Sequence, residues 1–206
     1  MGFLNYIFVT LIIIFSSCLC HLQAQNQKDT IIYDLYVNEE VIGDLVAVRS
    51  INPDSTIQLE VTSEADYRFL FSFHIRFHYV SSYNAKGEFI SSEFLYLMND
   101  DIKETNWINC NTQNCSVYEG DELKEIIDNK TGLTALNLYF NEPQHNEIVF
   151  SERFADYFEV EKEDDDGYKV DFPGGSTNHY YYKNGSCYKI KINTLISDMV
   201  FRLREN

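Results

Sequence analysis

Two histidines in the stretch RFLFSFHIRFHYV, residues 68–80, have a spacing that can serve metal binding. His74 and His78 are four residues apart, which on a helix would place both imidazoles on one face within chelating range. The stretch alternates between apolar and polar residues, however, and this pattern predicts a strand. Four residues of strand span about 13 Å, which is too far for a shared ion. We therefore expect no metal site, and no motif indicates a cofactor.

The two faces of this predicted strand differ in chemistry. One face carries six apolar side chains, which we expect at the centre of the core: Phe69, Phe71, Phe73, Ile75, Phe77 and Tyr79. The other face carries a basic stripe: Arg68, His74, Arg76 and His78. Carboxylates on neighbouring strands are expected to neutralise the stripe, with Glu93 as a partner for His78. If the stripe instead lines a concavity, it is a site for an anionic ligand.

A second group of polar residues follows two apolar segments. Glu142 comes after LNLYF, and Ser151-Glu152-Arg153 comes after IVF. In an extended chain Ser151 and Arg153 share a face. Arg153 can hold an anionic group at the mouth of a barrel, or it can pair with Glu142 or another loop carboxylate and pin an irregular segment to the sheet. The second interpretation is favoured because polar groups in loops need partners.

No catalytic set emerges from the sequence. The motifs GxSxG and HExxH are absent, and no cysteine has the sequence context of a nucleophile. A hydrolase that uses acidic residues such as Glu142 and Glu152 remains an alternative. The candidate ligand-binding residues are Arg76, His78, His74, Arg153, Ser151 and Glu142.

In an oxidising compartment, two of the cysteines could form a disulfide. Cys110 and Cys115 can close the short loop CNTQNC across a hairpin, which would stabilise the fold by at most about 3 kcal/mol. A CxxxxC pair without further ligands is weak evidence for zinc. Cys187 is then left over, either free in the core or paired with another chain.

The N-terminal segment is expected to direct export. Residues 1–24 contain no Lys, Arg, Asp or Glu, and Ile7 to Leu19 form an apolar run of signal-peptide length. Cleavage after Ala24 would leave residues 25–206 as a single β domain, periplasmic or extracellular. The alternative is a lipoprotein anchored through Cys18.

Composition narrows the class of partner. The chain has 206 residues, of which 45% are hydrophobic and 15% aromatic, enough for one packed core. Its formal net charge of −16 disfavours nucleic acid, because phosphates would be repelled.

Period-two patterns dominate beyond the N-terminal segment, and they predict about ten to twelve antiparallel strands with one short helical segment near 131–140. Residues 120–144 are the least strand-like. A strand from 67 to 83 would extend about 55 Å, so it must bend. We therefore expect a strongly curved antiparallel barrel or half-barrel, with a two-sheet β-sandwich as the alternative.

The turn Asn84-Ala85-Lys86-Gly87 sets the register of the strands on either side. Simple pairing of Asn84 with Gly87 places Phe77 opposite Phe94 and His78 opposite Glu93. A glycine bulge would shift the register by one residue and mix the faces.

Three segments resemble an exported β-rich family found in Bacteroidota, the domain of unknown function 6134. They are YDLYVNEEVIGDLVAVR (33–49), LNLYFNEPQHNEIVFSERF (136–154) and NHYYYKNGSCYKIKI (178–192). The resemblance implies a secreted or periplasmic β protein, and it implies no activity.

The sequence thus favours an exported, non-enzymatic, barrel-like protein with a binding or structural role at the cell envelope. Alternatives are a carrier of an apolar or amphipathic ligand, the hydrolase, and a small outer-membrane barrel. The partner would be an apolar or anionic small ligand or an envelope protein.

Overall fold

The computed structural model describes residues 27–68, 72–129, 132–144, 147–163, 167–193 and 198–205. These residues form sixteen strands and one 3₁₀ helix, η1. The elements are β1 Gln27–Val37, β2 Glu40–Ile51, β3 Ile57–Arg68, β4 Ser72–Tyr83, β5 Phe89–Met98, β6 Asp101–Cys110, β7 Asn114–Glu119, β8 Glu122–Asp128, β9 Leu133–Thr134, η1 Ala135–Tyr139, β10 Ile148–Ser151, β11 Asp156–Glu159, β12 Glu161–Lys162, β13 Gly167–Phe172, β14 Ser176–Lys183, β15 Ser186–Asn193 and β16 Asp198–Leu203. The predicted signal peptide and Cys18 lie outside the described residues. Within them, no helix is both long enough and apolar enough to cross a membrane.

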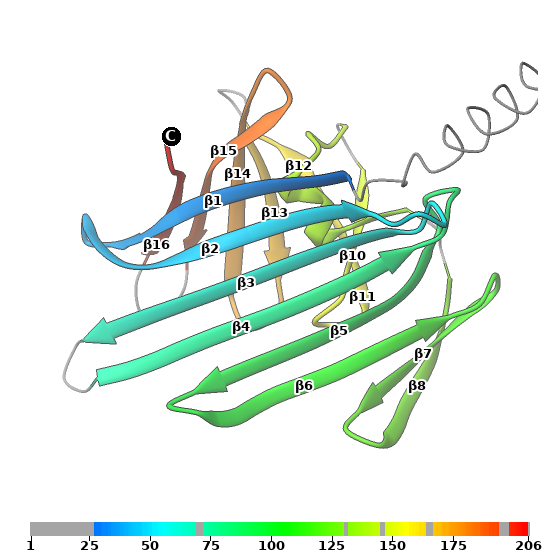
Figure 1. Cartoon of the computed structure of the whole chain (residues 1–206). Helices are drawn as coiled ribbons and strands as arrows, with labels where there is room; N and C mark the ends of the chain where they lie inside the picture. The colour runs from blue at the N-terminus through cyan, green and yellow to red at the C-terminus, as the bar shows by residue number, and fades with distance from the viewer. Residues whose placement is uncertain are drawn as a thin grey trace, which may run out of the picture.

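Thirteen strands form one antiparallel sheet in the order β12-β13-β14-β15-β16-β1-β2-β3-β4-β5-β6-β7-β8. Pairing of β1 with β16 joins the N-terminal and C-terminal hairpins. The sheet curves around a small second sheet, β11-β10-β9 (Figure 1). Its end strands β8 and β12 are not neighbours in the sheet, so the barrel is open. The expected curved antiparallel barrel or half-barrel is confirmed, and it contains more strands than the ten to twelve predicted.

The stretch 68–80 is not one strand, and this prediction was wrong. β3 ends at Arg68 and β4 begins at Ser72, and these two residues are paired across an antiparallel hairpin. Residues 69–71, which include Phe69 and Phe71, lie outside the described residues. Apolar and polar residues alternate in both strands of a hairpin, so the alternation alone does not show where one strand ends and the next begins. The sequence between residues 68 and 72 also contains no Gly, Pro or Asn that would indicate a turn.

Residues 120–144 also contain a strand that the sequence did not indicate. β8 occupies Glu122–Asp128, and nearly all of its side chains are exposed. An edge strand that is exposed on both faces does not need apolar side chains on one face, so its sequence does not alternate between apolar and polar residues. The expected helical segment near 131–140 is found as η1, a short 3₁₀ helix at Ala135–Tyr139.

The centre of the core lies elsewhere than predicted. Phe73, Ile75, Phe77 and Tyr79 are only half-buried. The most deeply buried residues come from the inner face of the curved sheet and from the segment folded inside it; they include Tyr33, Leu59, Leu138, Val149 and Val170. The prediction failed because alternation identifies the inner face of a strand, whereas depth of burial depends on what covers that face.

The cover is residues 133–144 and 147–159, which we call the interior segment; it contains β9, η1, β10 and β11. Leu136 and Leu138 of η1 are buried against the sheet. The Tyr182 hydroxyl donates to the Leu138 carbonyl at 2.6 Å, and the hydroxyls of Tyr83 and Thr134 are 2.6 Å apart. Sheet strands from both halves of the chain therefore hold the interior segment by buried hydrogen bonds.

Two bulges set the β4–β5 register. At the predicted turn, Gly87 N donates to Asn84 O, and Gly87 has a φ of 80°. The glycine shifts the pairing by one residue, and a second irregularity between Ser82 and Tyr83 shifts it by one more. A total shift of two residues again places apolar side chains opposite apolar side chains on the same face of the sheet. As a result, Phe77 lies opposite Tyr96, not Phe94 as simple pairing predicted.

Candidate functional site

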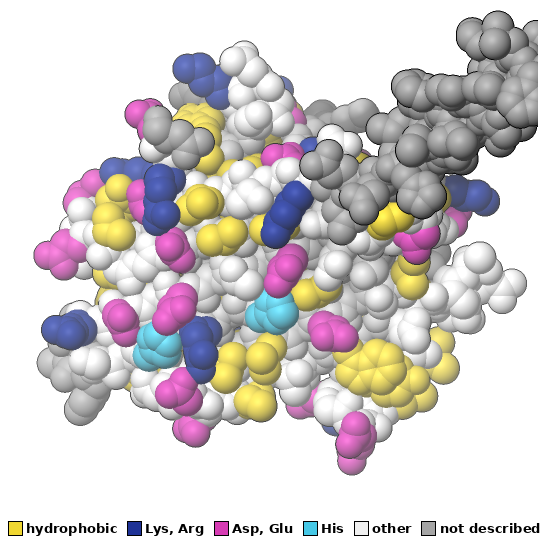
Figure 2. Space-filling model, viewed as in Figure 1, with side chains coloured by type: hydrophobic (Ala, Val, Ile, Leu, Met, Phe, Trp, Pro, Cys, Tyr) yellow, Lys and Arg dark blue, Asp and Glu magenta, His cyan; other side chains and the backbone are white. Residues whose placement is uncertain are grey.

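The basic stripe lies on the outer face of the sheet and is neutralised there by acidic side chains. His74 contacts Asp66 (Nδ1 to Oδ1, 3.1 Å) and Glu64 (Nε2 to Oε1, 3.3 Å). Arg76 pairs with Asp100. Figure 2 shows histidines on this face next to acidic and basic side chains.

The partner of His78 differs from the expected one. His78 Nε2 lies 3.1 Å from Glu60 Oε1 on β3, whereas Glu93 lies opposite Val80. The stripe does not line the concave face, because residues of the opposite parity on β3, such as Val61 and Ala65, are the buried ones. Among the described residues, no group of three or more His, Cys, Asp or Glu could hold a metal ion.

The concave face carries a surface of half-buried aromatic and apolar side chains. We call it the open aromatic surface; its members are Phe73, Ile75, Phe77, Tyr96 and Met98. Cross-strand pairs unite them, because Phe77 lies opposite Tyr96 and Ile75 opposite Met98. The Phe77 and Tyr96 rings stack with centroids 4.7 Å apart. These residues lie in the first half of β4 and the second half of β5, the parts of these strands at the left of Figure 1, away from β10 and β11.

An ion pair marks the boundary between the open aromatic surface and the filled interior. Arg153, in the turn after β10, donates two hydrogen bonds to Glu104 of β6: Nε to Oε1 at 3.0 Å and Nη2 to Oε2 at 2.6 Å. Its guanidinium also lies over the Phe94 ring, 5.4 Å from the centroid. Asn106 Nδ2 donates to the Arg153 carbonyl at 2.6 Å. Arg153 therefore pins this turn to the sheet, through Glu104 and not through Glu142.

Tyr79 borders the same ion pair. Its ring is 4.4 Å from the Phe94 ring and is half-buried. Burial raises the pKa of Tyr79, opposed by the charge of Arg153 and supported by those of Glu152 and Glu104.

Behind this boundary, Glu152 is a buried carboxyl that is only 1% exposed. Ser81 Oγ donates to Glu152 Oε1 at 3.0 Å, while Oε2 has no hydrogen-bond partner among the described residues. Burial raises the pKa of Glu152, although nearby donors, foremost the Thr134 hydroxyl, oppose the shift. The neighbouring Ser151 is also buried.

Residues 33–204 match the family model described as Domain of unknown function (DUF6134). The chain belongs to this family. The family resemblance of the sequence is thereby confirmed, while the Bacteroidota source and export stay predictions. A comparison with curated proteins found no match.

A solved structure shows the same fold as this DUF6134 chain. It is the crystal structure of a beta-barrel-like protein of domain of unknown function DUF1849 from Brucella abortus. The two chains are 12% identical, with a TM-score of 0.56 over 85% of this chain and 95% of that one. At this level of identity the likeness establishes the fold alone.

In this DUF6134 protein the six candidate ligand-binding residues fall in three places. His74, Arg76 and His78 lie on the outer face, and Ser151 and Arg153 lie near the concave face. Glu142 lies in an exposed loop, where its Oε1 accepts a hydrogen bond from the Tyr168 hydroxyl at 3.2 Å. Ligand binding by any of them stays a prediction.

Two residues of this region were missed or undervalued at the level of sequence. Glu104 lies in a strand of mixed polarity that gives no hint of an inward carboxylate. Glu152 could have been suspected, because it directly follows the buried run IVFS.

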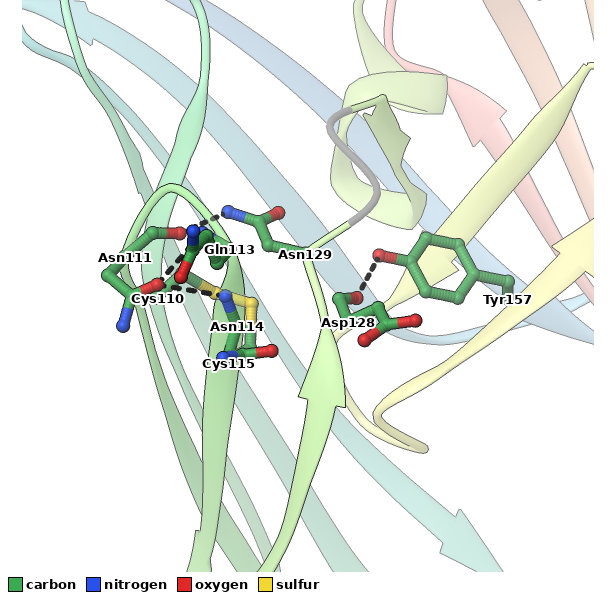
Figure 3. The surroundings of a disulfide bond; sticks show 8 residues. All are labelled: Cys110, Asn111, Gln113, Asn114, Cys115, Asp128, Asn129 and Tyr157. Carbon is green, nitrogen blue, oxygen red and sulfur yellow. Dashed lines mark hydrogen bonds between the residues drawn. A yellow bond between two sulfur atoms is a disulfide. The ribbon is translucent and has the colours of Figure 1, made fainter.

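The expected disulfide is present between Cys110 and Cys115 (Figure 3). Cys187 is a free thiol and is buried. Burial raises its pKa to about 12. Pairing of Cys187 with another chain would require β15 to open.

Proposed function

We propose that this protein is a non-enzymatic binding protein that takes an apolar or amphipathic ligand against the open aromatic surface. The observation that supports this most directly is the row of half-buried rings on the concave face, where Phe77 and Tyr96 stack beyond the cover of the interior segment. Aromatic side chains left partly solvated on a concave face form a site at which an apolar molecule gains binding energy by displacing water.

The filled part of the barrel limits the size of the ligand. Leu138, Val149 and Val170 occupy the interior behind the Arg153–Glu104 pair, so the ligand lies outside that boundary. A polar end of an amphipathic ligand would meet the paired guanidinium and carboxylate, which together carry no net charge. The site therefore favours neutral or weakly polar end groups over strongly anionic ones.

Binding can be measured with a fluorescent long-chain alcohol and the corresponding fatty acid. The variant Phe77→Ser/Tyr96→Ser should weaken binding of the alcohol at least tenfold. The matched control is Tyr188→Ser, which removes an exposed aromatic ring from β15 and should leave binding unchanged. If Phe77→Ser/Tyr96→Ser and Tyr188→Ser weakened binding of the alcohol equally, or if the unmodified protein did not bind it, a ligand site on the open aromatic surface would be refuted.

We further propose that the protein is exported. The uncharged apolar segment 1–24 and the Cys110–Cys115 disulfide support this location. Osmotic shock should release a protein that begins at Gln25. Detection of a mature chain that starts at a lipidated Cys18 would show that the exported protein is a lipoprotein and not a soluble protein. Recovery of the uncleaved chain in the cytoplasm would refute export.

A further inference from the structure

Strand β8 ends the large sheet and is paired on one side only, with β7. Leu123 and Ile126 on its outer face are 51% and 62% exposed. Next to them, Trp107 is 37% exposed, and its ring stacks on Tyr118 with centroids 4.0 Å apart. Figure 2 shows hydrophobic side chains gathered at the lower right, where Figure 1 places β6 to β8. An edge strand bordered by an exposed apolar face is a typical site for the addition of another strand.

The backbone of β8 is available at the middle of the strand. Asn111 N donates to Asn114 O, so the next pair, Cys110 with Cys115, is a non-hydrogen-bonded pair. Cys115 then directs its amide and carbonyl toward Ile127, and by alternation those of Ile126 point outward. The outward carbonyl of Asp128 accepts a bond from the Tyr157 hydroxyl at 3.3 Å (Figure 3). The edge is thus capped at Asp128 and free at Ile126.

The charges along this edge are mostly negative. Residues 119–128, EGDELKEIID, contain five acidic residues and one lysine. Lys124 Nζ pairs with Glu119 at 3.2 Å and with Glu122 at 3.4 Å. Among the described residues, neither Glu125 nor Asp128 has an ion-pair partner. Glu125 lies on the face opposite to Ile126, so the two faces of the edge differ in chemistry.

We propose that β8 is a docking edge for an extended segment of a partner protein in which basic side chains alternate with apolar ones. Its backbone would pair with Ile126. Its apolar side chains would extend the face of Leu123 and Trp107, and its basic side chains would lie beside Glu125 on the other face. A second copy of this chain fits poorly, because two acidic edges would meet in a protein of net charge −16.

The test uses a capped eight-residue peptide of alternating lysine and valine, with the glutamate–valine peptide for comparison. Trp107 is the only tryptophan in the chain, and its ring stacks on Tyr118, which lies opposite Leu123 of β8, so its emission reports on the sheet beside the edge. The lysine peptide should change the emission with saturation and should slow hydrogen exchange within residues 122–128. The glutamate peptide should do neither.

Two variants examine the charge and the backbone separately. Glu125→Lys should weaken binding of the lysine peptide at least tenfold, while Glu40→Lys, an equal change of charge at the exposed start of β2, should alter it less than twofold. Ile126→Pro removes the outward N–H of the edge and should also abolish peptide binding. Circular dichroism checks that this variant folds. If Ile126→Pro does not fold, the binding measured with Glu125→Lys is the test of the proposal.

Three outcomes would overturn the proposal. Equal weakening by Glu125→Lys and Glu40→Lys would mean non-specific attraction to an acidic protein. Unchanged hydrogen exchange within residues 122–128 in the presence of the lysine peptide would mean that the edge takes no strand of this kind. Self-association in sedimentation experiments that Ile126→Pro abolishes would identify a second copy as the occupant.

Discussion

The residues around the candidate site form two contrasting polar environments a short distance apart. Arg153 and Glu104 compensate each other at the edge of the concave face, whereas Glu152 is buried with one oxygen unpaired. A paired charge stabilises a turn, but a buried carboxyl without full compensation costs free energy when it ionises. The functional proposals rest on the first environment, and the second makes the stability of the protein depend on pH.

Replacement of Glu152 by glutamine should reveal this dependence. The pKa of Glu152 is raised above its ordinary value of 4.5, so the folded protein holds this proton more tightly than the unfolded chain does. The resulting stabilisation is present below pH about 4.5 and is lost as pH rises through the folded-state pKa. The unfolding free energy of Glu152→Gln should therefore rise relative to that of wild type as the pH increases from 4 to 8.

Urea unfolding followed by tryptophan emission measures the difference at each pH. Glu142→Gln serves as the control, because it makes the same chemical change at an exposed position. A difference for Glu152→Gln that does not grow with pH would contradict the assignment of Glu152 as the titrating group.

Cys187 should be unreactive in the folded protein. Its thiol is buried and its pKa is about 12, so very little thiolate is present at pH 8. In protein that begins at Gln25, a colorimetric thiol reagent should titrate no thiol in the native state and one thiol per chain in denaturant. Rapid labelling of the native protein would show that β15 opens readily.

At the scale of elements, hairpins with local signals follow the sequence closely. Asn38 and Glu39 form the β1–β2 turn with φ of 50° and 63°, and Asn184 and Gly185 form the β14–β15 turn with φ of 53° and 78°. Turn residues act over a few positions, so a short sequence specifies them. The segment between β3 and β4 has no such residues, and the alternating pattern of the sequence therefore predicted a single strand.

The disulfide should act on one hairpin and leave the rest of the sheet unaffected. Its loop, residues 110–115, is short, so the variant Cys110→Ser/Cys115→Ser should lose at most about 3 kcal/mol in unfolding free energy. Hydrogen exchange should become faster in β7 and β8, which lie at the end of the sheet, and should stay unchanged in β1 to β3. Equal acceleration in all these strands would contradict a local effect.

At the scale of the whole molecule, the open sheet depends on the interior segment for its core. The sheet does not close on itself, so the segment between β9 and β11 supplies the apolar surface against which both halves pack. Leu138 is fully buried, and its carbonyl is held by Tyr182. Loss of packing at this position should weaken the entire fold.

Leu138→Ala should lower the unfolding free energy by about 3 kcal/mol, because it leaves a cavity at the centre of the core. Leu123→Ala, a matched change on the exposed edge, should alter it by less than about 0.5 kcal/mol. Thermal unfolding of both variants provides the comparison. If Leu138→Ala destabilised the protein no more than Leu123→Ala, the interior segment would not be a structural core.

Period-two alternation and local turns were enough to predict an antiparallel, curved all-β fold and the Cys110–Cys115 pair, because each depends on residues that are close in the chain. The site was not predictable in the same way. Arg153 meets Glu104, and His78 meets Glu60, across 49 and 18 positions of sequence. The His78–Glu60 contact follows from the pairing of β3 with β4, and the Arg153–Glu104 contact follows from a segment that folds back inside the sheet. Such long-range placements depend on the packing of the whole chain, and no short pattern of residues encodes them.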